Sequence, residues 1–146
     1  MKNIFKGNPD ESLGYLVSRV FGLRQKKMNE ELAEINLNYA QYNLLMGLYW
    51  LQLQGETINQ MMLISHTKLD KSVVSNILRQ MANDKIVIRR ENPNDTRAKV
   101  ISLTAKGEDL AAQAIQIINR VDETFWGNQP QESICQFFND VLNLNS

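Results

Sequence analysis

Apolar residues in the first quarter of the chain recur at helical spacing. Between about Asp10 and Ile35 they form one stripe, which is typical of an amphipathic helix. The residues of this stripe are Leu13, Leu16, Val17, Val20, Phe21, Met28, Leu32 and Ile35. The next segment, Tyr39 to Leu53, is apolar on nearly every side, so we expect a central helix there. Gly55 predicts where this helix stops, because glycine readily takes the left-handed conformation that ends helices.

A pair of shorter helices joined by a tight turn is predicted next. Thr57 and Gln60 have the spacing of a capping box, which predicts a helix that starts with Thr57 as its N-cap and runs to about Ser65. Residues 66–69 form the turn. Asp70 or Ser72 then caps a second helix, and that helix ends near position 83.

Two β-rich segments follow this helix pair. The first spans residues 85–91 and contains Ile86-Val87-Ile88, and the second is Val100-Ile101-Ser102-Leu103. Between them, residues 92–96 are rich in turn formers. The pattern therefore predicts a short two-stranded hairpin with a long tip.

The last part of the chain predicts two more helices. Thr104 caps a long helix that runs to about Phe125, residues 127–130 interrupt it, and a final helix carries Phe137 and Phe138. The fold class is mainly α with a small β-hairpin (α+β). A helix pair joined by a tight turn and followed by a hairpin is the order of a winged helix-turn-helix. We expect one domain over residues 1–146.

Charge is distributed unevenly along a chain whose net charge is zero. Residues 68–106 contain nine basic and four acidic side chains, a net charge of +5, whereas the remainder carries −5. A basic middle between acidic ends suggests a surface for a polyanion. A merely solvated face is the alternative.

Several other classes of protein are disfavoured by the sequence. A single cysteine, Cys135, and a single histidine, His66, make neither a disulfide nor a Cys/His metal site, and Cys135 has apolar neighbours that favour a small buried residue over a redox sensor. His66 has no nucleophile near it in sequence, and no Gly-rich phosphate loop, HExxH or GxSxG motif occurs, so we predict no enzyme, cofactor or metal. Residues 1–9 lack the apolar stretch of a signal peptide, and no run of about 20 apolar residues occurs. We expect a cytoplasmic protein without a membrane partner.

The second helix of the predicted pair has a face suited to DNA. Ser72, Ser75, Asn76 and Arg79 lie at i, i+3, i+4 and i+7 and share one side. Short hydroxyls allow close approach, while asparagine and arginine can form bidentate bonds with adenine and guanine in the major groove. Lys71, near the helix start, is placed for a phosphate. An ordinary polar helix face is the alternative.

The predicted hairpin tip adds a second basic element. Its cations are Arg89, Arg90, Arg97 and Lys99. Such a tip can lie along the DNA backbone and insert Arg97 into the minor groove, where narrow A·T tracts concentrate negative potential. Asp95 can hold the Arg97 guanidinium in place. The alternative is a surface ion pair worth about 0–1 kcal/mol.

Two segments resemble those of the MarR family of multiple antibiotic resistance regulators. Residues 70–78, Asp-Lys-Ser-Val-Val-Ser-Asn-Ile-Leu, resemble its recognition helix. Residues 95–107 resemble its wing signature, Asp-x-Arg followed by Leu-Thr-x-x-Gly. In element order the resemblance covers roughly residues 13–142.

The resemblance implies a homodimeric transcriptional regulator, which we expect to be a repressor on a near-palindromic operator. It implies that helix 70–83 enters the major groove, that the wing, about residues 89–99, enters the minor groove, and that Arg97 is the minor-groove residue supported by Asp95. About 39–104 would be the DNA-binding lobe, and 10–35 and 105–144 the dimerisation helices. The apolar stripes of the terminal helices agree, although packing within one chain is the alternative.

The resemblance also implies release from DNA by a small ligand, often aromatic or phenolic. Tyr39, Tyr42, Met46, Trp50 and Met62 are candidate pocket residues, with ordinary core packing as the alternative reading. A rival function is a winged-helix dimer that has lost DNA binding and serves as a protein-interaction or ligand-binding module.

Three features depart from the family pattern. Lys85 stands where glycine is usual, so we expect Asn83 or Asp84 to take the left-handed cap instead. Asn76 stands where arginine or lysine is frequent, which bears on base preference. The first helix has no cysteine, unlike the peroxide-sensing branch of the family, which argues against thiol-based sensing of that type.

Overall fold

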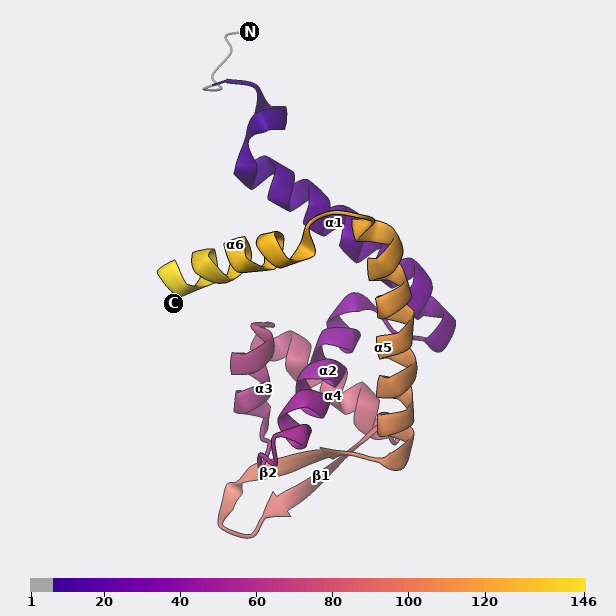
Figure 1. Ribbon diagram of the computed structural model, residues 1–146. Helices are drawn as coiled ribbons and strands as arrows, with labels where there is room; N and C mark the ends of the chain where they lie inside the picture. Colours follow the sequence, from indigo (N-terminus) through magenta and orange to yellow (C-terminus); the bar gives the residue numbers. More distant parts are fainter. Residues whose placement is uncertain (1–6) are drawn as a thin grey trace, which may run out of the picture.

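Helices make up most of the structure, in the order that the apolar spacing predicts. The computed structural model describes residues 7–146, without the side chains of Pro9 and of residues 95–98. The elements are η1 (Pro9–Glu11), α1 (Leu13–Leu32), η2 (Ala33–Ile35), α2 (Tyr39–Leu53), α3 (Gln60–Thr67), α4 (Lys71–Asn83), β1 (Val87–Asn92), β2 (Asp95–Leu103), α5 (Ala105–Trp126) and α6 (Gln131–Leu144). The predicted fold class, mainly α with a small β-hairpin, is confirmed (Figure 1).

Helix α2 lies at the centre of the lobe, as its all-round apolar character predicts. Leu44, Leu45 and Leu48 are fully buried in α2, and α3, α4 and α5 all contact this helix. Its start is fixed by a capping box in which Asn38 accepts from the Gln41 backbone N–H and the Gln41 side chain accepts from the Asn38 N–H, each at 2.9 Å. The lobe therefore has a filled core that holds α3 and α4 in place.

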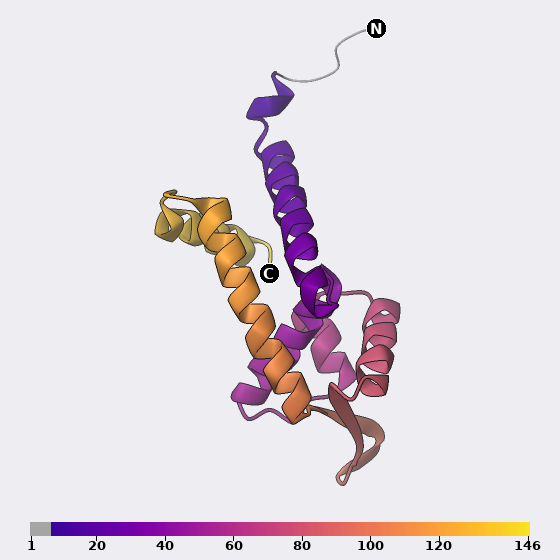
Figure 2. The ribbon, with the colours of Figure 1, turned by 90° about the vertical axis from the view of Figure 1, so that its right-hand side faces the viewer.

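Helices α1 and α5 lie side by side and extend away from this lobe (Figure 2). α1 is buried only at its C-terminal end, at Met28 and Leu32. Gly127, with φ 54°, turns the chain after α5, and α6 then runs back across the top of the lobe (Figure 1). No residue of α6 is buried. None of the helices in the described part of the chain is long and apolar enough to cross a membrane.

The hairpin projects from the far side of the lobe (Figure 1). β1 and β2 pair antiparallel from Val87↔Leu103 to Asn92↔Asp95, with an irregularity between residues 91 and 92. β2 starts five residues earlier than predicted, because the turn needs only Pro93 and Asn94, and Asn92 pairs with Asp95 across it. At the base, the Ile101 N–H donates to the Ile58 carbonyl at 2.8 Å and the Leu103 N–H donates to Gln52 Oε1 at 3.0 Å. These bonds fix the hairpin to the lobe.

The predicted capping box at Thr57 is wrong. α3 begins at Gln60 with Asn59 as its N-cap, whose side chain accepts from the Met62 N–H at 3.0 Å. Ile58 is 1% exposed and its carbonyl accepts from the hairpin, so this carbonyl is not free for a helical bond and the helix starts after it. At the other end, α3 continues through Thr67, two residues beyond the predicted end.

The left-handed residue after α4 is Lys85, not Asn83 or Asp84 as predicted. Lys85 has φ 58°. Its N–H donates to Ala82 O at 3.1 Å, and the Ile86 N–H donates to Met81 O at 2.8 Å. These two bonds form a Schellman motif, in which the residue after the helix C-cap must be left-handed. The motif brings Ile86 into the core, and lysine accepts the strained conformation that glycine usually takes.

Cys135 is exposed, which corrects the expectation of a buried apolar residue. Its neighbours Phe137 and Phe138 are themselves 43% and 41% exposed, because nothing in this single chain covers the stripe of α6. The apolar sequence around Cys135 belongs to a helix face that this chain leaves uncovered, and not to the core.

Candidate nucleic-acid interface

A tight turn sets the direction of α4. The Lys68 N–H donates to Ile64 O at 3.0 Å, and Lys68 itself is left-handed with φ 57°. Thr67 Oγ1 donates to Leu63 O at 2.7 Å, which holds the last turn of α3. Asp70 is the N-cap of α4, with extended backbone and without a side-chain capping bond. α3 and α4 thus form a helix-turn-helix with a turn of three residues.

The two faces of α4 separate as their spacing predicts. Val74, Ile77, Leu78 and Met81 are buried against the lobe. Four of the proposed DNA-contacting residues, Lys71, Ser72, Asn76 and Arg79, are exposed on the outside of the helix. Ser75 differs, because it is half-buried and its hydroxyl accepts from Gln60 Nε2 of α3 at 3.0 Å. The structure therefore brings four of the five together on one accessible face and places Ser75 at its border.

Side-chain bonds order this outer face. Arg79 Nη1 donates to Asn76 Oδ1 at 3.4 Å, so the guanidinium and the amide lie next to each other. Gln80, also exposed, accepts from Gln41 Nε2 at 3.3 Å. Sequence reasoning missed Gln80, although it lies at i+4 from Asn76 and thus shares the same side of the helix. It also missed the bonds that Gln41 and Gln60 make to α4, since bonds between different helices leave no local sequence pattern.

The hairpin places further cations beyond the end of α4. Arg89, Arg90 and Lys99 are exposed, and Lys99 lies opposite Glu91 in the ladder. Asp95 and Arg97 belong to the first half of β2, but their side chains lie outside the described residues, so the predicted support of Arg97 by Asp95 stays a prediction. Among the described side chains, no ion pair involves a cation of α4 or of the hairpin.

The end of α4, the base of the hairpin and the start of α5 are joined at one junction. Thr104 Oγ1 donates to Lys85 O at 2.6 Å and accepts from the Gly107 N–H at 3.0 Å, which confirms Thr104 as the cap of α5. The Lys106 ammonium donates to Asp84 O at 2.8 Å. A Cβ at position 107 would overlap the carbonyl of Ile86, so glycine is required there by close packing. This junction explains the Leu-Thr-x-x-Gly part of the wing signature.

The candidate ligand-pocket residues divide into two groups. Tyr39, Tyr42 and Met46 are half-buried and pack against the core, while Met62 is half-buried and Trp50 is 55% exposed. Tyr39 makes an edge-on contact with Phe21, with ring centroids 5.8 Å apart. Burial raises the pKa of Tyr42, and the nearby positive charge of Arg24 opposes part of that rise. None of the five lines the apolar groove, the smaller α1–α5 pocket or the pocket beside Cys135 that the described residues form.

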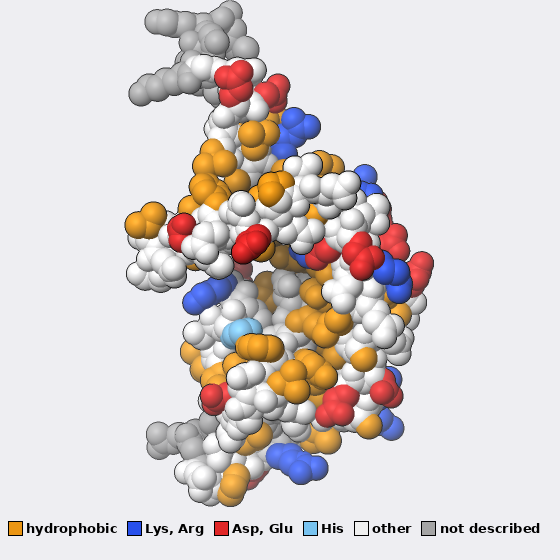
Figure 3. Space-filling model, viewed as in Figure 1, with side chains coloured by type: hydrophobic (Ala, Val, Ile, Leu, Met, Phe, Trp, Pro, Cys, Tyr) orange, Lys and Arg blue, Asp and Glu red, His pale blue; other side chains and the backbone are white. Residues whose placement is uncertain are grey.

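An apolar groove of about 490 Å³ lies elsewhere, between α1, the end of α5 and α6. Its lining residues are Leu16, Val17, Val20, Phe21, Arg24, Trp126, Ile134 and Phe138. Arg24 is the only charged residue among them, and its hydrogen bond to Asp122 raises its pKa, so it stays a cation. In Figure 3, hydrophobic side chains gather along α1 above α6, where this groove lies.

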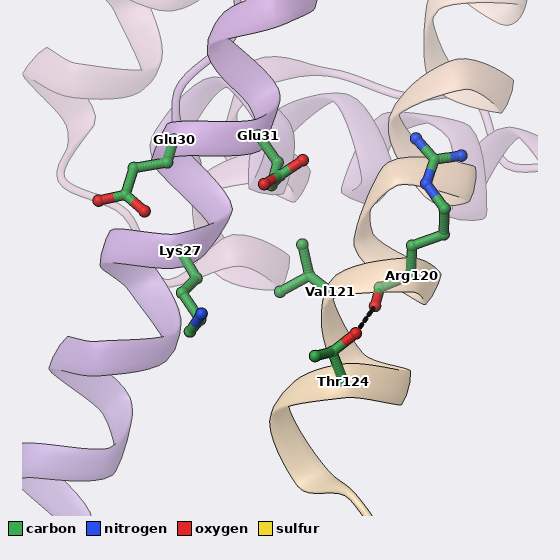
Figure 4. A pocket seen from close by; sticks show the side chains of 6 residues that line it. All are labelled: Lys27, Glu30, Glu31, Arg120, Val121 and Thr124. Carbon is green, nitrogen blue, oxygen red and sulfur yellow. Dashed lines mark hydrogen bonds between the residues drawn. The ribbon is translucent and has the colours of Figure 1, made fainter.

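A smaller pocket of about 200 Å³ lies between α1 and α5 on a polar surface. Val121 points from α5 toward α1, whereas the charged groups of Glu30 and Arg120 lie on opposite sides of the gap (Figure 4). The charges therefore do not converge on one point. Within the described part of the chain, no three His, Cys, Asp or Glu side chains are grouped to hold a metal ion.

Comparisons with known proteins agree with this geometry. A family model described as "ArnR1-like, winged-helix domain" matches residues 33–122. The HTH-type transcriptional regulator YdcH of Bacillus subtilis, itself uncharacterized, is 30% identical over 118 residues, which cover 81% of this chain and 80% of that protein.

Solved structures are similar over almost the whole chain. CouR from Rhodococcus jostii RHA1, bound to p-coumaroyl-CoA, has a TM-score of 0.82 at 22% identity and covers 95% of each chain. A mutant of MarR from E. coli, complexed with operator DNA, has a TM-score of 0.77 at 20% identity and covers 98% of this chain and 99% of that one. The fold, including α1 and α6, is thus the fold of these proteins.

Proposed function

Since this chain belongs to the MarR family of winged-helix transcriptional regulators, we propose that it binds a near-palindromic operator as a homodimer and represses transcription from it. Helix α4 would enter the major groove. The hairpin, about residues 89–99, would enter the adjacent minor groove. The relatives are regulators, so a regulatory role without catalysis fits this chain.

The exposed face of α4 is the observation that carries this proposal. Ser72, Asn76 and Arg79 stand clear of the lobe while the opposite face of the same helix is buried. An α-helix fits the major groove, and asparagine and arginine side chains match the edges of adenine and guanine there. The Arg79–Asn76 bond is long, at 3.4 Å, so base contacts can replace it without a large loss.

The cations around this face supply the contacts to phosphate. Lys71 lies at the N-terminus of α4, and Arg89, Arg90 and Lys99 are exposed on the hairpin. We assign Arg97 to the minor groove and Asp95 to its support, from the resemblance and from their place in β2. Phosphate contacts of this kind position a protein on DNA, whereas the α4 side chains would choose the sequence.

The arm of α1 and α6 supports the homodimer. Its apolar residues are exposed in the single chain: Leu13, Leu16, Val17, Val20 and Phe21 on α1, and Phe137, Phe138, Val141, Leu142 and Leu144 on α6. Contiguous apolar surface of this extent is rare on soluble monomers and marks association sites. We therefore infer that residues 39–104 form the DNA-binding lobe and that 10–35 and 105–144 pair with the second copy.

Selection from a random duplex library with purified protein at physiological salt tests the proposal. We expect enrichment of a near-palindrome whose half-sites are about 10–10.5 bp apart, centre to centre. The affinity for that sequence should fall steeply with salt, because bound phosphates release counterions. Failure to enrich any sequence, with affinity that does not depend on salt, would favour a winged-helix dimer that works only through proteins or ligands.

We extend the proposal to a small aromatic effector that weakens operator binding. CouR, which has this fold, was solved with p-coumaroyl-CoA. Here Arg24 lines the apolar groove and lies near the half-buried Tyr39 and Tyr42, so an aromatic acid entering the groove would meet apolar side chains and a cation. Fluorescence anisotropy of the labelled operator, titrated with a panel of aromatic acids, measures the effect. If none releases the operator, the effector part of the proposal is refuted and the DNA-binding part is unaffected.

A further inference from the structure

A cluster of polar side chains joins α1 to the far end of α5. Arg24 donates from Nε to Asp122 Oδ1 and from Nη2 to Asp122 Oδ2, both at 2.8 Å. Trp126 Nε1 also donates to Asp122 Oδ1, at 3.0 Å. The Arg24 and Asp122 side chains are 24% and 32% exposed, so the pair is partly shielded from water. Two-point bonding of this kind fixes orientation as well as distance.

This pair differs from the other ion pairs formed by the described side chains. Lys26–Glu30 lies within α1, and Arg19–Asp10 joins α1 to the short η1 before it. Of the ion pairs between described side chains, only Arg24–Asp122 connects two of the long helices. Arg24 and Trp126, which both bond to Asp122, also line the apolar groove between α1, α5 and α6.

The opposite end of α5 is fastened to the recognition helix. Thr104 and Lys106 bond to the carbonyls of Lys85 and Asp84, directly after the last residue of α4. Gly107 packs against the Ile86 carbonyl with no room for a side chain. α5 has 22 residues, which at 1.5 Å per residue is about 33 Å. It is therefore a rod with one end fixed to α4 and the other clamped to α1.

We propose that the Arg24–Asp122–Trp126 clamp fixes the distance between the two recognition helices of the dimer and so selects the spacing of the operator half-sites. The inference rests on the proposed function, in which α1 and α6 pair with the second copy. If the clamp loosens, α5 tilts against α1, and each α4 moves relative to the dimer axis without losing any contact of its own to DNA. Arg24, Asp122 and Trp126 are thus positioning residues for spacing, not for base recognition.

Operators with altered spacing test this inference. The two selected half-sites are placed at the selected spacing and with one base pair added or removed, which moves one half-site by about 3.4 Å and rotates it by about 35°. Full-length wild-type protein should bind the altered operators about tenfold or more weakly. The readout is the ratio of the affinity for the selected spacing to the affinity for the altered spacing. Asp122→Asn keeps an acceptor for Trp126 and loses the charge. We expect the ratio to fall to about threefold or less in this variant, because a less firmly positioned α5 discriminates less between spacings.

Glu30→Gln is the matched control. It breaks the Lys26–Glu30 pair, which lies within α1 and does not reach α5. We expect the wild-type ratio in this variant. If Asp122→Asn also keeps the wild-type ratio, the clamp does not set spacing and the inference is overturned, while the proposed function stands. If the wild-type protein binds no operator, the proposed function fails and the inference falls with it.

A distance measurement covers the case in which Asp122→Asn does not fold. Spin labels are attached at Asn83→Cys, the exposed last residue of α4, in a Cys135→Ser background. Pulsed electron resonance should give one narrow distance between the labels in the parent dimer. Trp126→Phe, which keeps an aromatic side chain and removes the indole donor to Asp122, should broaden that distribution. An unchanged distribution in this variant would contradict the inference without any use of DNA.

Discussion

The lobe and the arm of this molecule bury their apolar residues in different ways. In the lobe, Leu44, Leu45, Leu48, Leu63 and Leu78 are all fully buried within one chain. In the arm, Leu13 is 59% exposed and Leu142 66%, although their spacing is as regular as that of the lobe. Regular apolar spacing therefore shows which face a helix buries, but not whether its own chain or another copy covers that face.

The lobe should lose stability when its core is cut, and this is the largest effect expected. Leu48→Ala removes a fully buried side chain at the centre of α2, and such changes lower the free energy of unfolding by about 2–5 kcal/mol. Urea unfolding followed by circular dichroism measures it. Leu53→Ala is the control on the same helix, because Leu53 is 63% exposed and should change stability by less than about 0.5 kcal/mol. Equal losses in both variants would contradict a core centred on α2.

The arm should lose association instead. Phe138→Asp places a carboxylate on the exposed apolar face of α6, and we expect monomers by light scattering with an unchanged lobe. Affinity for the full operator should fall by about 100-fold or more, because the second half-site no longer adds to the first. Asn143→Asp adds the same charge on the opposite side of α6 and should leave the dimer intact. A dimeric Phe138→Asp protein would show that this face is not the dimer contact.

The outer surface of the lobe should discriminate between sequences. Asn76→Ala removes a side chain with base-reading chemistry from the exposed face of α4. We expect about 1–3 kcal/mol less discrimination at one base pair in each half-site, with little change on random DNA. Binding to the selected operator and to its single-base variants measures this. Equal losses on operator and random DNA would instead assign Asn76 to general contacts.

A mutation in the hairpin should cause a smaller loss of DNA affinity, and the loss should be the same for every DNA sequence. Arg97→Ala is expected to weaken binding by roughly tenfold on operator and random DNA alike, and to reduce the slope of log K against log salt by about 1. The unfolding midpoint should stay unchanged, since the neighbouring turn residues Pro93 and Asn94 are exposed and the buried core does not extend to them. An unaltered affinity would remove Arg97 from the interface and leave the wing assignment to Arg89, Arg90 and Lys99.

Local chemistry made much of this fold predictable. The bounds of α2 follow from its apolar run and Gly55, and the cap of α5 follows from the threonine, Thr104, that precedes a long amphipathic pattern. The exposed face of α4 follows from helical spacing alone. In each case the cause lies within a few residues of the effect.

Contacts between distant segments account for what could not be predicted. Thr57 has the right partner for a cap, but the carbonyl of Ile58 accepts from the Ile101 N–H, 43 positions later in the chain, and the helix begins after it. Lys85 is left-handed because Ile86 must reach the core beside Met81. The Arg24–Asp122 pair spans 98 positions and has no local pattern at all. The side chains of the candidate site were thus easier to find than the bonds that position them.

The backbone bond between Ile101 and Ile58 has a consequence for aggregation. A two-stranded sheet leaves two open edges, and an open edge can pair with the strand of another molecule. In this hairpin the Ile101 N–H, on the outer edge of β2, is already engaged by the segment before α3. Strand β1, at the other edge, carries the exposed charges of Arg89, Arg90 and Glu91, which oppose edge-to-edge pairing with a strand of another molecule. The hairpin can therefore project far into solvent at high protein concentration without seeding intermolecular sheets.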